Sequence, residues 1–372
     1  MDFVTLTNMV WAALGATWHE ARIACLTEML RGILTSQSIN TARLAARMGD
    51  RVQFESHAQR IRRLLAEQIF DWIVIGRLML RIAGVAGQKK FVVAVDRTNW
   101  DFGKTAINFL VISVVVCGLG VPVVWRQLGK KGNSKTAERL DLLERFLKIV
   151  PASQITVFVA DREFIGGAWF KALQKHRIPY VIRVRNNQFA TLADGRRIKI
   201  SALAEDLTNQ KPRTWQNVDL DDVPCTLALK RLSDKDLLAV VSFGLKLSAD
   251  PLETYRQRWA IELCFACLKT KGFDIESTHL RHADRLEKMF AIASMAAAAA
   301  LAASKNDDKI QAGSHKNPRR KKPRLRRPLR FSPWPEPASV LFIPSANLSL
   351  QIIALWCRVV CQSNVFRSIH AA

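Results

Sequence analysis

The stretch KFVVAVDRTNW (residues 90–100) decides the fold, because an apolar run ends there on a single acidic residue. The segment FVVAV is rich in β-branched residues and is typical of a buried strand, and Asp96 follows it directly. A second apolar run, QITVFVAD (154–161), ends in the same way on Asp161. Each Asp is either an ordinary turn residue at a strand end or part of an active site. The order of the neighbouring elements decides between these alternatives.

The elements around these two strands follow an ordered pattern. They are, in chain order, strands over residues 90–98, 107–118 and 121–128, a helix over 138–150, a strand over 154–161, a helix over 166–178 and a strand over 180–187. Short connections between the first three strands indicate an antiparallel meander. This order matches the ribonuclease-H-like fold, in which the first and fourth strands are adjacent and parallel. We therefore expect Asp96 and Asp161 to lie at the same edge of a mixed α/β sheet.

The charge of the chain indicates its partner. Lys and Arg number 56 against 32 Asp and Glu, which gives a net charge of +24 over 372 residues. This excess predicts attraction to a polyanion, either nucleic acid or an anionic membrane surface. The N-terminus lacks the basic segment of a signal peptide, and the apolar segments 109–125 and 289–303 are shorter than the ~20 residues of a spanning helix. We therefore expect nucleic acid as the partner and no membrane.

The seven cysteines are scattered and odd in number, which predicts reduced thiols in a cytosolic protein. Cys264 and Cys267 form a single CxxC within a helical pattern. A zinc site needs more ligands than these two, so we expect ordinary packing for both.

The composition divides the chain into five regions of a mixed α/β protein. They are a helical region over 1–85, the first part of the core over 86–188, a β-rich insertion over 189–250, a core helix with a C-terminal helix over 251–304, and a basic tail with an unassigned end over 305–372. In the first region, a short helix precedes one longer Arg-bearing helix over residues 55–80. This arrangement resembles a helix-turn-helix and favours DNA binding over a plain helical bundle with a solvated basic face. Residues 316–330 carry nine basic residues and three prolines, which predicts a disordered cationic segment. We expect the insertion to stand apart from the central sheet and to close over DNA.

Paired carboxylates at one sheet edge predict a cation between them. Two like charges a few ångströms apart repel unless a positive charge separates them, and hard oxygen ligands select Mg²⁺ or Mn²⁺. A third ligand is expected from the segment YRQRWAIELCFACLK (255–269). At 100° per residue, Tyr255, Arg258, Glu262 and Lys269 fall within an arc of about 60° on one helix face. Glu262 is then predicted to face both aspartates, with the three other residues spaced along one edge like successive phosphate contacts.

Each of these residues also has an ordinary interpretation. A lone Asp at a strand end is more often a turn residue, and an Arg and a Glu on one helix face usually form a solvated ion pair. Their joint occurrence, in fold order and on a strongly basic chain, makes the ordinary interpretation improbable.

The chain resembles bacterial insertion-sequence transposases of the DDE class, in the IS-four family. The resemblance is carried by VAVDRTNW (93–100), LGKKGNSKTAERLDLLERFL (128–147), VFVADREF (157–164) and YRQRWAIELCFACLK (255–269). The last segment contains the family's Y-x2-R-x3-E-x6-K signature intact, as Tyr255, Arg258, Glu262 and Lys269. The similarity covers roughly residues 20–290, and the chain departs from the family pattern after about residue 304.

The resemblance implies both the site and the partners. It implies that Asp96, Asp161 and Glu262 are catalytic and hold two Mg²⁺ ions, with Mn²⁺ as a substitute. It implies that Tyr255, Arg258 and Lys269 bind phosphates at the element's end, and it makes Trp215 the candidate for stacking on a flipped base. The implied partners are double-stranded DNA, as terminal inverted repeats and target, and a second copy of the chain on paired ends in the cytoplasm.

The resulting hypothesis is a metal-dependent DNA transposase that works by cut and paste. End cleavage by hydrolysis frees a 3′-OH, which then attacks target DNA at the same site, and a hairpin at the element end is one route between these steps. The alternative is a catalytically inactive remnant that binds DNA and acts as an inhibitor, which the aberrant tail favours and the intact triad opposes. A hydrolytic nuclease that nicks without joining is a third possibility.

Overall fold

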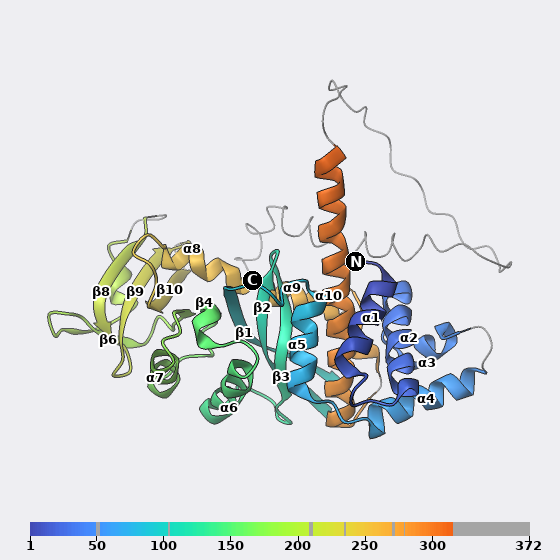
Figure 1. Ribbon diagram of the computed structural model, residues 1–372. Helices are drawn as coiled ribbons and strands as arrows, with labels where there is room; N and C mark the ends of the chain where they lie inside the picture. Colours follow the sequence, from blue (N-terminus) through green and yellow to red (C-terminus); the bar gives the residue numbers. More distant parts are fainter. Residues whose placement is uncertain are drawn as a thin grey trace, which may run out of the picture.

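The computed structural model describes residues 1–49, 53–102, 105–207, 211–233, 236–269, 272–278 and 280–314. Its helical N-terminal region and its β-rich region lie at opposite ends of the molecule, and strands β1–β4 lie between them (Figure 1). The predicted mixed α/β class is confirmed, because a single ten-stranded sheet combines parallel and antiparallel pairs. The basic segment 316–330 and the rest of the C-terminal end lie outside the described residues.

In the part of the N-terminal region that the structure describes there are five helices. They are α1 (Phe3–Leu14), α2 (Glu20–Ser36), α3 (Thr41–Arg47), α4 (Phe54–Glu67) and α5 (Trp72–Ile82). The single long helix expected over 55–80 is wrong, because Asp71 begins a new helix there. Its carboxylate accepts hydrogen bonds from the amides of Ile73 and Val74, and the buried Phe70 fixes the turn between α4 and α5. Along α4, Arg62 and Arg63 are exposed, whereas Ile61 and Leu64 face the core.

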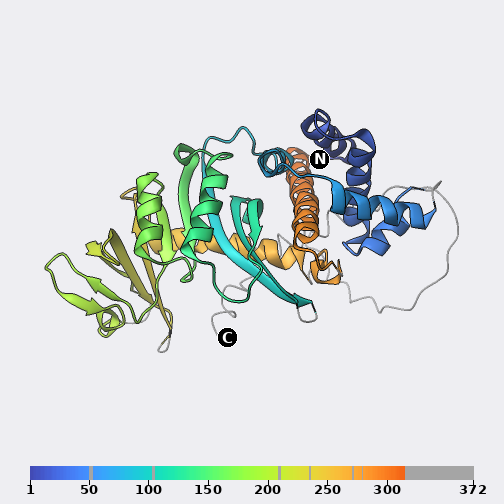
Figure 2. The same ribbon diagram turned by 90° about the horizontal axis from the view of Figure 1, so that it is seen from below.

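The central strands follow the predicted order. They are β1 (Phe91–Phe102), β2 (Thr105–Val116), β3 (Leu119–Gln127), β4 (Ile155–Ala160) and β5 (Tyr180–Arg183). The first three form the expected antiparallel meander, and Cys117 and Gly118, both at positive φ, make the two-residue turn between β2 and β3. The predicted parallel pairing of the first and fourth strands is confirmed, since β1 pairs with β4 from Phe91 to Val95. Beyond this pairing the β1–β2 hairpin projects past the other strands (Figure 2).

The β-rich region is a continuation of the central sheet. It contains β6 (Phe189–Thr191), β7 (Arg197–Lys199), β8 (Arg213–Asp219), β9 (Pro224–Arg231) and β10 (Leu237–Phe243). Its expected strand content is confirmed, but its expected separation from the central sheet is wrong. Strand β10 pairs antiparallel with β5, with Val240 opposite Arg183, so the strand order runs β3-β2-β1-β4-β5-β10-β9-β8-β6-β7. Strand β10 covers the edge of β5, which would otherwise be open, and β7 becomes the last strand on this side of the sheet.

Two sets of helices pack on the sheet. The connections after β3 and β4 contain α6 (Thr136–Leu147), the short 3₁₀ helix η1 (Ala152–Gln154) and α7 (Gly167–Lys175), and η2 (Ala202–Ala204) lies in the β-rich region. After β10 come α8 (Pro251–Tyr255), η3 (Arg256–Arg258), α9 (Trp259–Leu268), η4 (Ile275–Thr278) and α10 (Ala283–Ser314). Helix α9 packs on β1, β2 and β3, and η4 lies between it and α10.

Helix α10 joins the N-terminal helices to the sheet, because it contacts α2, α4, α5 and β3 (Figure 1). Its segment Ala283–Ser304 is, by length and composition alone, long and apolar enough to cross a membrane. This corrects the expectation that the segment is too short. However, 94% of the apolar window is buried inside the protein, as in the core helix of a globular fold.

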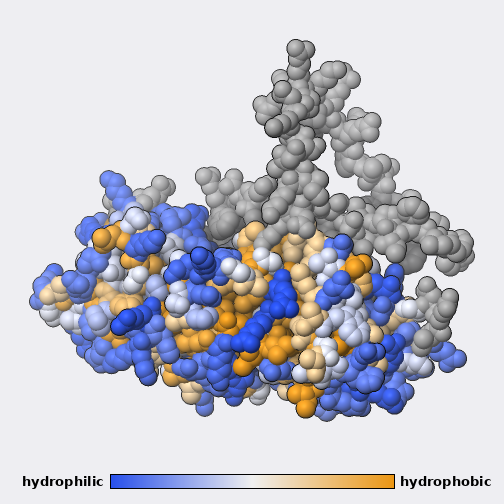
Figure 3. Space-filling model, viewed as in Figure 1, coloured by the Kyte–Doolittle hydropathy of each residue, from blue (hydrophilic) through white to orange (hydrophobic). Residues whose placement is uncertain are grey.

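On the face of the molecule shown in Figure 3, hydrophilic residues dominate the two ends and apolar residues gather at the middle.

A cavity lies where α5 meets β3 and α6. Its volume is about 330 Å³, and its lining includes Phe70, Trp72, Val123 and Trp125.

Candidate active site

The structure brings Asp96 and Asp161 side by side. The last paired residues of β1 and β4 are Val95 and Ala160, so Asp96 and Asp161 are the residues that directly follow this pair in the two chain segments. The expectation that Asp96 ends its strand is wrong, since β1 continues to Phe102 by pairing with β2 and Asp96 lies opposite Val111. Asp161 does end its strand, because the chain turns away after Ala160. The shared edge was therefore predicted correctly, although only one of the two strands stops there.

The start of α9 supplies the other charged groups. Arg258 lies between two carboxylates, with Nη1 at 3.3 Å from Oδ2 of Asp96 and 2.5 Å from Oε1 of Glu262. The hydroxyl of Tyr255 donates a hydrogen bond to Oδ1 of Asp161 over 3.3 Å, and the Arg258 guanidinium lies 5.6 Å from the centre of the Tyr255 ring. One cation and one phenol therefore tie the helical segment to the two strand-end aspartates.

Burial controls the protonation of this cluster. Burial, together with the nearby Asp161 and Glu262, raises the pKa of Asp96 to about 7, although Arg258 and the amide of Arg97 oppose the shift. Burial also raises the pKa of Tyr255, so its hydroxyl stays protonated and remains a donor. For Arg258, burial lowers the pKa but the surrounding acidic groups outweigh it and raise the net value, so the guanidinium stays charged.

The backbone over residues 255–269 differs from the single regular helix that was assumed for this segment. Residues 256–258 form a 3₁₀ turn, and α9 begins at Trp259 and ends at Leu268, so 255–269 is not one regular helix. Lys269 follows the helix end with a non-helical backbone, and its Nζ donates to the carbonyl of Asn99 over 2.8 Å and lies 5.7 Å from the Trp100 ring centre. Lys269 thus binds the projecting β1–β2 hairpin, whereas Tyr255 and Arg258 point into the acidic cluster. The expectation that these three residues line up along one edge like successive phosphate contacts stays a prediction.

A glycine sets how closely α9 approaches the sheet. A Cβ atom at Gly120 on β3 would lie 2.9 Å from Cα of Ile261 and 3.1 Å from the carbonyl oxygen of Ala260. Both contacts are to the helix backbone, which cannot move without displacing the whole helix. Gly120 therefore allows the contact that places Glu262, the next residue along α9, beside the aspartates.

Trp215 is not brought to this cluster. It lies on β8, and four strand spacings of about 4.8 Å, or roughly 19 Å, separate β8 from β4. Its half-buried ring packs against the hydrophobic core, with the Arg213 guanidinium 5.8 Å from the ring centre. Cys264 and Cys267, by contrast, are both buried in α9, which agrees with the predicted packing role.

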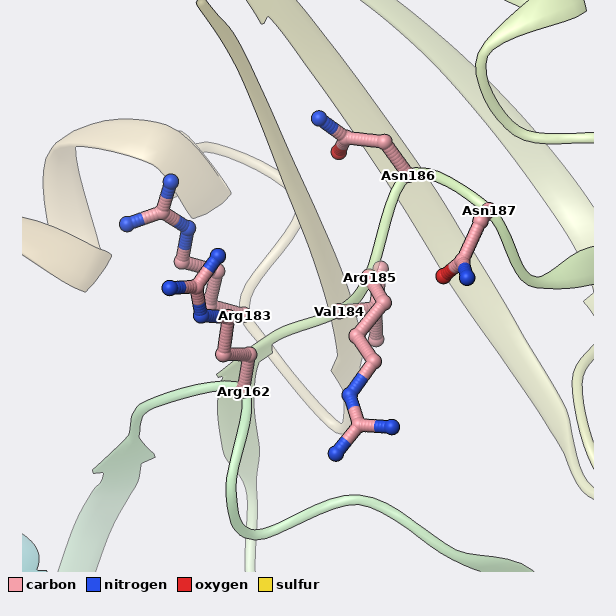
Figure 4. Close-up of a pocket in the computed structure, with 6 residues that line it drawn as sticks. All are labelled: Arg162, Arg183, Val184, Arg185, Asn186 and Asn187. Atoms are coloured by element: carbon pink, nitrogen blue, oxygen red, sulfur yellow. The ribbon is translucent and has the colours of Figure 1, made fainter.

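A basic pocket beside Asp161 was missed by the sequence argument. It has a volume of about 490 Å³ and is lined by Arg162, Arg183, Val184, Arg185, Asn186 and Asn187. Arg162 follows Asp161 and Arg183 ends β5, and their side chains extend next to one another, with Arg185 on the far side (Figure 4). The sequence carries one indication of this pocket. Arg183 and Arg185 alternate along the segment RVR (183–185), directly after a buried apolar run, which places both side chains on the same side of the chain. The pocket gathers three arginines from the two segments that directly follow Asp161 and β5.

The carboxylate set fits a hard divalent cation in its chemistry, since Asp96, Asp161 and Glu262 offer only oxygen donors. The pKa of Asp96 is raised mainly by burial and further by the two neighbouring carboxylates, so a cation would stabilise its charged form. Among the described residues, however, no three Asp, Glu, His or Cys side chains are close enough to share one ion. Arg258 stands between Asp96 and Glu262 instead.

A family model described as "Transposase DDE domain" matches residues 87–299. The chain belongs to this family. The matched segment runs from just before β1 into α10, so the transposase domain includes every strand of the sheet and the whole acidic cluster. A solved structure similar to the chain is the "Cryo-EM structure of piggyBac transposase synaptic complex with hairpin DNA (SNHP)", at 9% identity and a TM-score of 0.46, covering 97% of this chain and 79% of that chain. A comparison with curated proteins gave no match.

Proposed function

We propose that this transposase cuts an insertion sequence out of DNA and pastes it into a target, as a member of the IS-four group. The observation that carries the proposal is the meeting of Asp96, Asp161 and the Glu262-bearing helix at one edge of the sheet. The intact Y-x2-R-x3-E-x6-K spacing at residues 255–269 supports the finer assignment. Water attacks the phosphate at the element's end, and the freed 3′-OH later attacks target DNA in the same site.

The charges around the site suit a scissile phosphate. Asp96, Asp161 and Glu262 would hold Mg²⁺ or Mn²⁺, which supplies charge neutralisation and activation of the attacking and leaving oxygens of an in-line displacement. Tyr255, through its hydrogen bond to Asp161, holds that carboxylate in place. The Arg258 guanidinium lies between Asp96 on β1 and Glu262 on α9. From there the side chain can exchange a carboxylate partner for a DNA phosphate.

The basic pocket suits the DNA backbone next to the cleaved bond. Its three arginines lie directly beyond Asp161 and offset the repulsion between a phosphodiester strand and the acidic cluster. Exposed arginines along α4 are a second candidate contact, in the predicted helix-turn-helix region. We propose that the active species is a homodimer that bridges two element ends in the bacterial cytoplasm, because paired cutting and joining require both ends together.

One incubation tests the function against its alternatives. Labelled duplex carrying the element's terminal repeat is mixed with target plasmid, Mg²⁺ and the full chain, and products are separated on a gel. Joined products are expected. Nicked products without joining would instead show a nuclease, and a shifted but uncut duplex would show a DNA-binding inhibitor. Asp161→Asn should abolish the products, whereas Asp141→Asn, which removes an exposed carboxylate on α6, should not.

A further inference from the structure

A second ion pair lies beside the acidic cluster, on the other face of the sheet. Nε of Arg97 donates to both carboxylate oxygens of Glu163 at 2.6 Å, and both side chains are largely buried, at 16% and 12% exposure. Arg97 is the residue after Asp96, and Glu163 lies two residues after Asp161. Because successive side chains on a strand point to opposite faces, Arg97 points away from Asp96 and from the α9 residues that contact it.

The Arg97–Glu163 pair is held by Asn108 on β2 and by the basic loop before α6, residues 128–135. Arg97 also donates to Oδ1 of Asn108 over 3.0 Å and to Oδ1 of Asn133 over 3.1 Å. Oε1 of Glu163 accepts hydrogen bonds from both the amide and the hydroxyl of Ser134, at 2.9 and 2.8 Å.

The loop itself is fixed from two sides. The buried Arg139 donates to the Ser134 hydroxyl over 2.9 Å and to its carbonyl over 2.7 Å. The side-chain amide of Asn108 donates to the carbonyls of Lys130 and Gly132, both at 2.9 Å. Ser134 and Asn108, which bind the ion pair, are thus themselves held by further hydrogen bonds, and this network makes the pair rigid.

The Arg97–Glu163 pair lies where the pairing of β1 with β4 ends. Backbone pairing between β1 and β4 ends at Val95 and Ala160, so the strand ladder stops one residue short of Asp96 and Asp161. The Arg97–Glu163 contact joins the two chain segments directly beyond that point. We propose that Arg97 and Glu163 are positioning residues that set the separation of Asp96 and Asp161, and thereby the affinity of that pair for a divalent cation. This inference rests on the proposed function.

The test uses substitutions at Glu163 in the full chain. Glu163→Ala removes the acceptor for Arg97 and Ser134, whereas Glu163→Gln keeps one acceptor oxygen of the same reach. Glu67→Ala, which removes the partner of Arg22 at 2.5 Å in the helical region, is the matched control. Mn²⁺ binding without DNA is measured by electron paramagnetic resonance of the free ion. DNA affinity is measured in chelator, and folding by thermal denaturation.

Removal of groups that orient metal ligands costs at least about tenfold in metal affinity. We expect Glu163→Ala to weaken Mn²⁺ binding about tenfold, Glu163→Gln to recover part of this loss, and Glu67→Ala to match the wild type. DNA affinity should stay within about twofold in all three, because the side chain touches neither phosphate-binding arginines nor the cluster. The Mn²⁺ concentration for half-maximal cleavage should rise by the same factor as the dissociation constant, which a loss of folded protein alone would not produce.

The outcomes separate this inference from the proposed function. Unchanged Mn²⁺ binding in both Glu163 variants, with a wild type that binds and cleaves, overturns the positioning role and leaves the function standing. Loss of DNA affinity in step with Mn²⁺ affinity shows that the pair only anchors the basic loop, and also overturns it. If Glu163→Ala does not fold, the Glu163→Gln result decides. A wild type that binds no Mn²⁺ and cuts no DNA overturns both.

Discussion

Replacing Asp96 by Asn should stabilise the protein at high pH. Burial next to Asp161 and Glu262 raises the pKa of Asp96 from its ordinary 3.8 to about 7. Between these values the folded chain holds a proton that the unfolded chain has lost, so stability falls as the pH rises through this window. At 1.36 kcal/mol per pKa unit, the two units between pH 5 and pH 7 correspond to about 3 kcal/mol. Asn stays neutral throughout and avoids this loss.

The assay compares melting temperatures of wild type and Asp96→Asn at pH 5 and pH 8, in chelator so that no divalent ion binds. At about 2 °C per kcal/mol for a chain of this size, the variant should gain roughly 5 °C on the wild type between the two pH values. Because the substitution also weakens the ion pair with Arg258, this gain is an upper limit. Asp141→Asn, at an exposed carboxylate paired with Arg126 and Arg145, should show no such gain. An equal difference between wild type and Asp96→Asn at both pH values would refute the burial of a repelled carboxylate at this position.

Three further outcomes are expected. Glu262→Gln should retain binding to element ends in a gel shift but lose Mg²⁺-dependent cleavage by orders of magnitude. Arg258→Ala should instead weaken the complex with the element ends. The opposite pattern would show that the roles of the two residues are misassigned. Gly120→Ala should displace the α9 backbone and reduce cleavage at least tenfold with little change in DNA affinity, and full activity would contradict the close approach of Ile261. Deletion of residues 316–330 should flatten the dependence of log K on log salt, by about 0.9 for each phosphate that the segment neutralises, and an unchanged slope would show that this segment does not touch DNA.

The sequence predicted the site where strand pairing alone determines geometry. Asp96 and Asp161 each follow a continuous β-branched run, and the element order requires those runs to be adjacent and parallel. Their approach therefore needs no knowledge of side-chain packing. Glu262 could be assigned to the cluster for a similar reason, since Ile261, Phe265 and Leu268 form an apolar strip that fixes which side of α9 meets the sheet.

Features that depend on local backbone breaks could not be predicted. The 3₁₀ turn at 256–258 and the helix end at Leu268 change the directions of Tyr255 and Lys269 from those on one regular helix, and Lys269 contacts the carbonyl of Asn99 on β1. Asp71 lies within a continuous amphipathic pattern, so its sequence position does not show that it caps a new helix rather than standing on the polar face of a long one. The joining of β10 to β5 is a contact between distant segments, which strand periodicity does not encode.

The charges of the site explain how a strongly basic chain can carry an acidic centre. Above pH 7, three carboxylates face one guanidinium in the cluster, so the centre repels a phosphodiester strand unless other cations compensate. Arg162, Arg183 and Arg185 supply those cations within one pocket directly beyond Asp161. Under the proposed function, a DNA strand in this pocket has its phosphates on arginines and only the reacting phosphate at the carboxylates. The net charge of +24 would then attract DNA of any sequence, and the arginine pocket would orient the bound strand at the carboxylates.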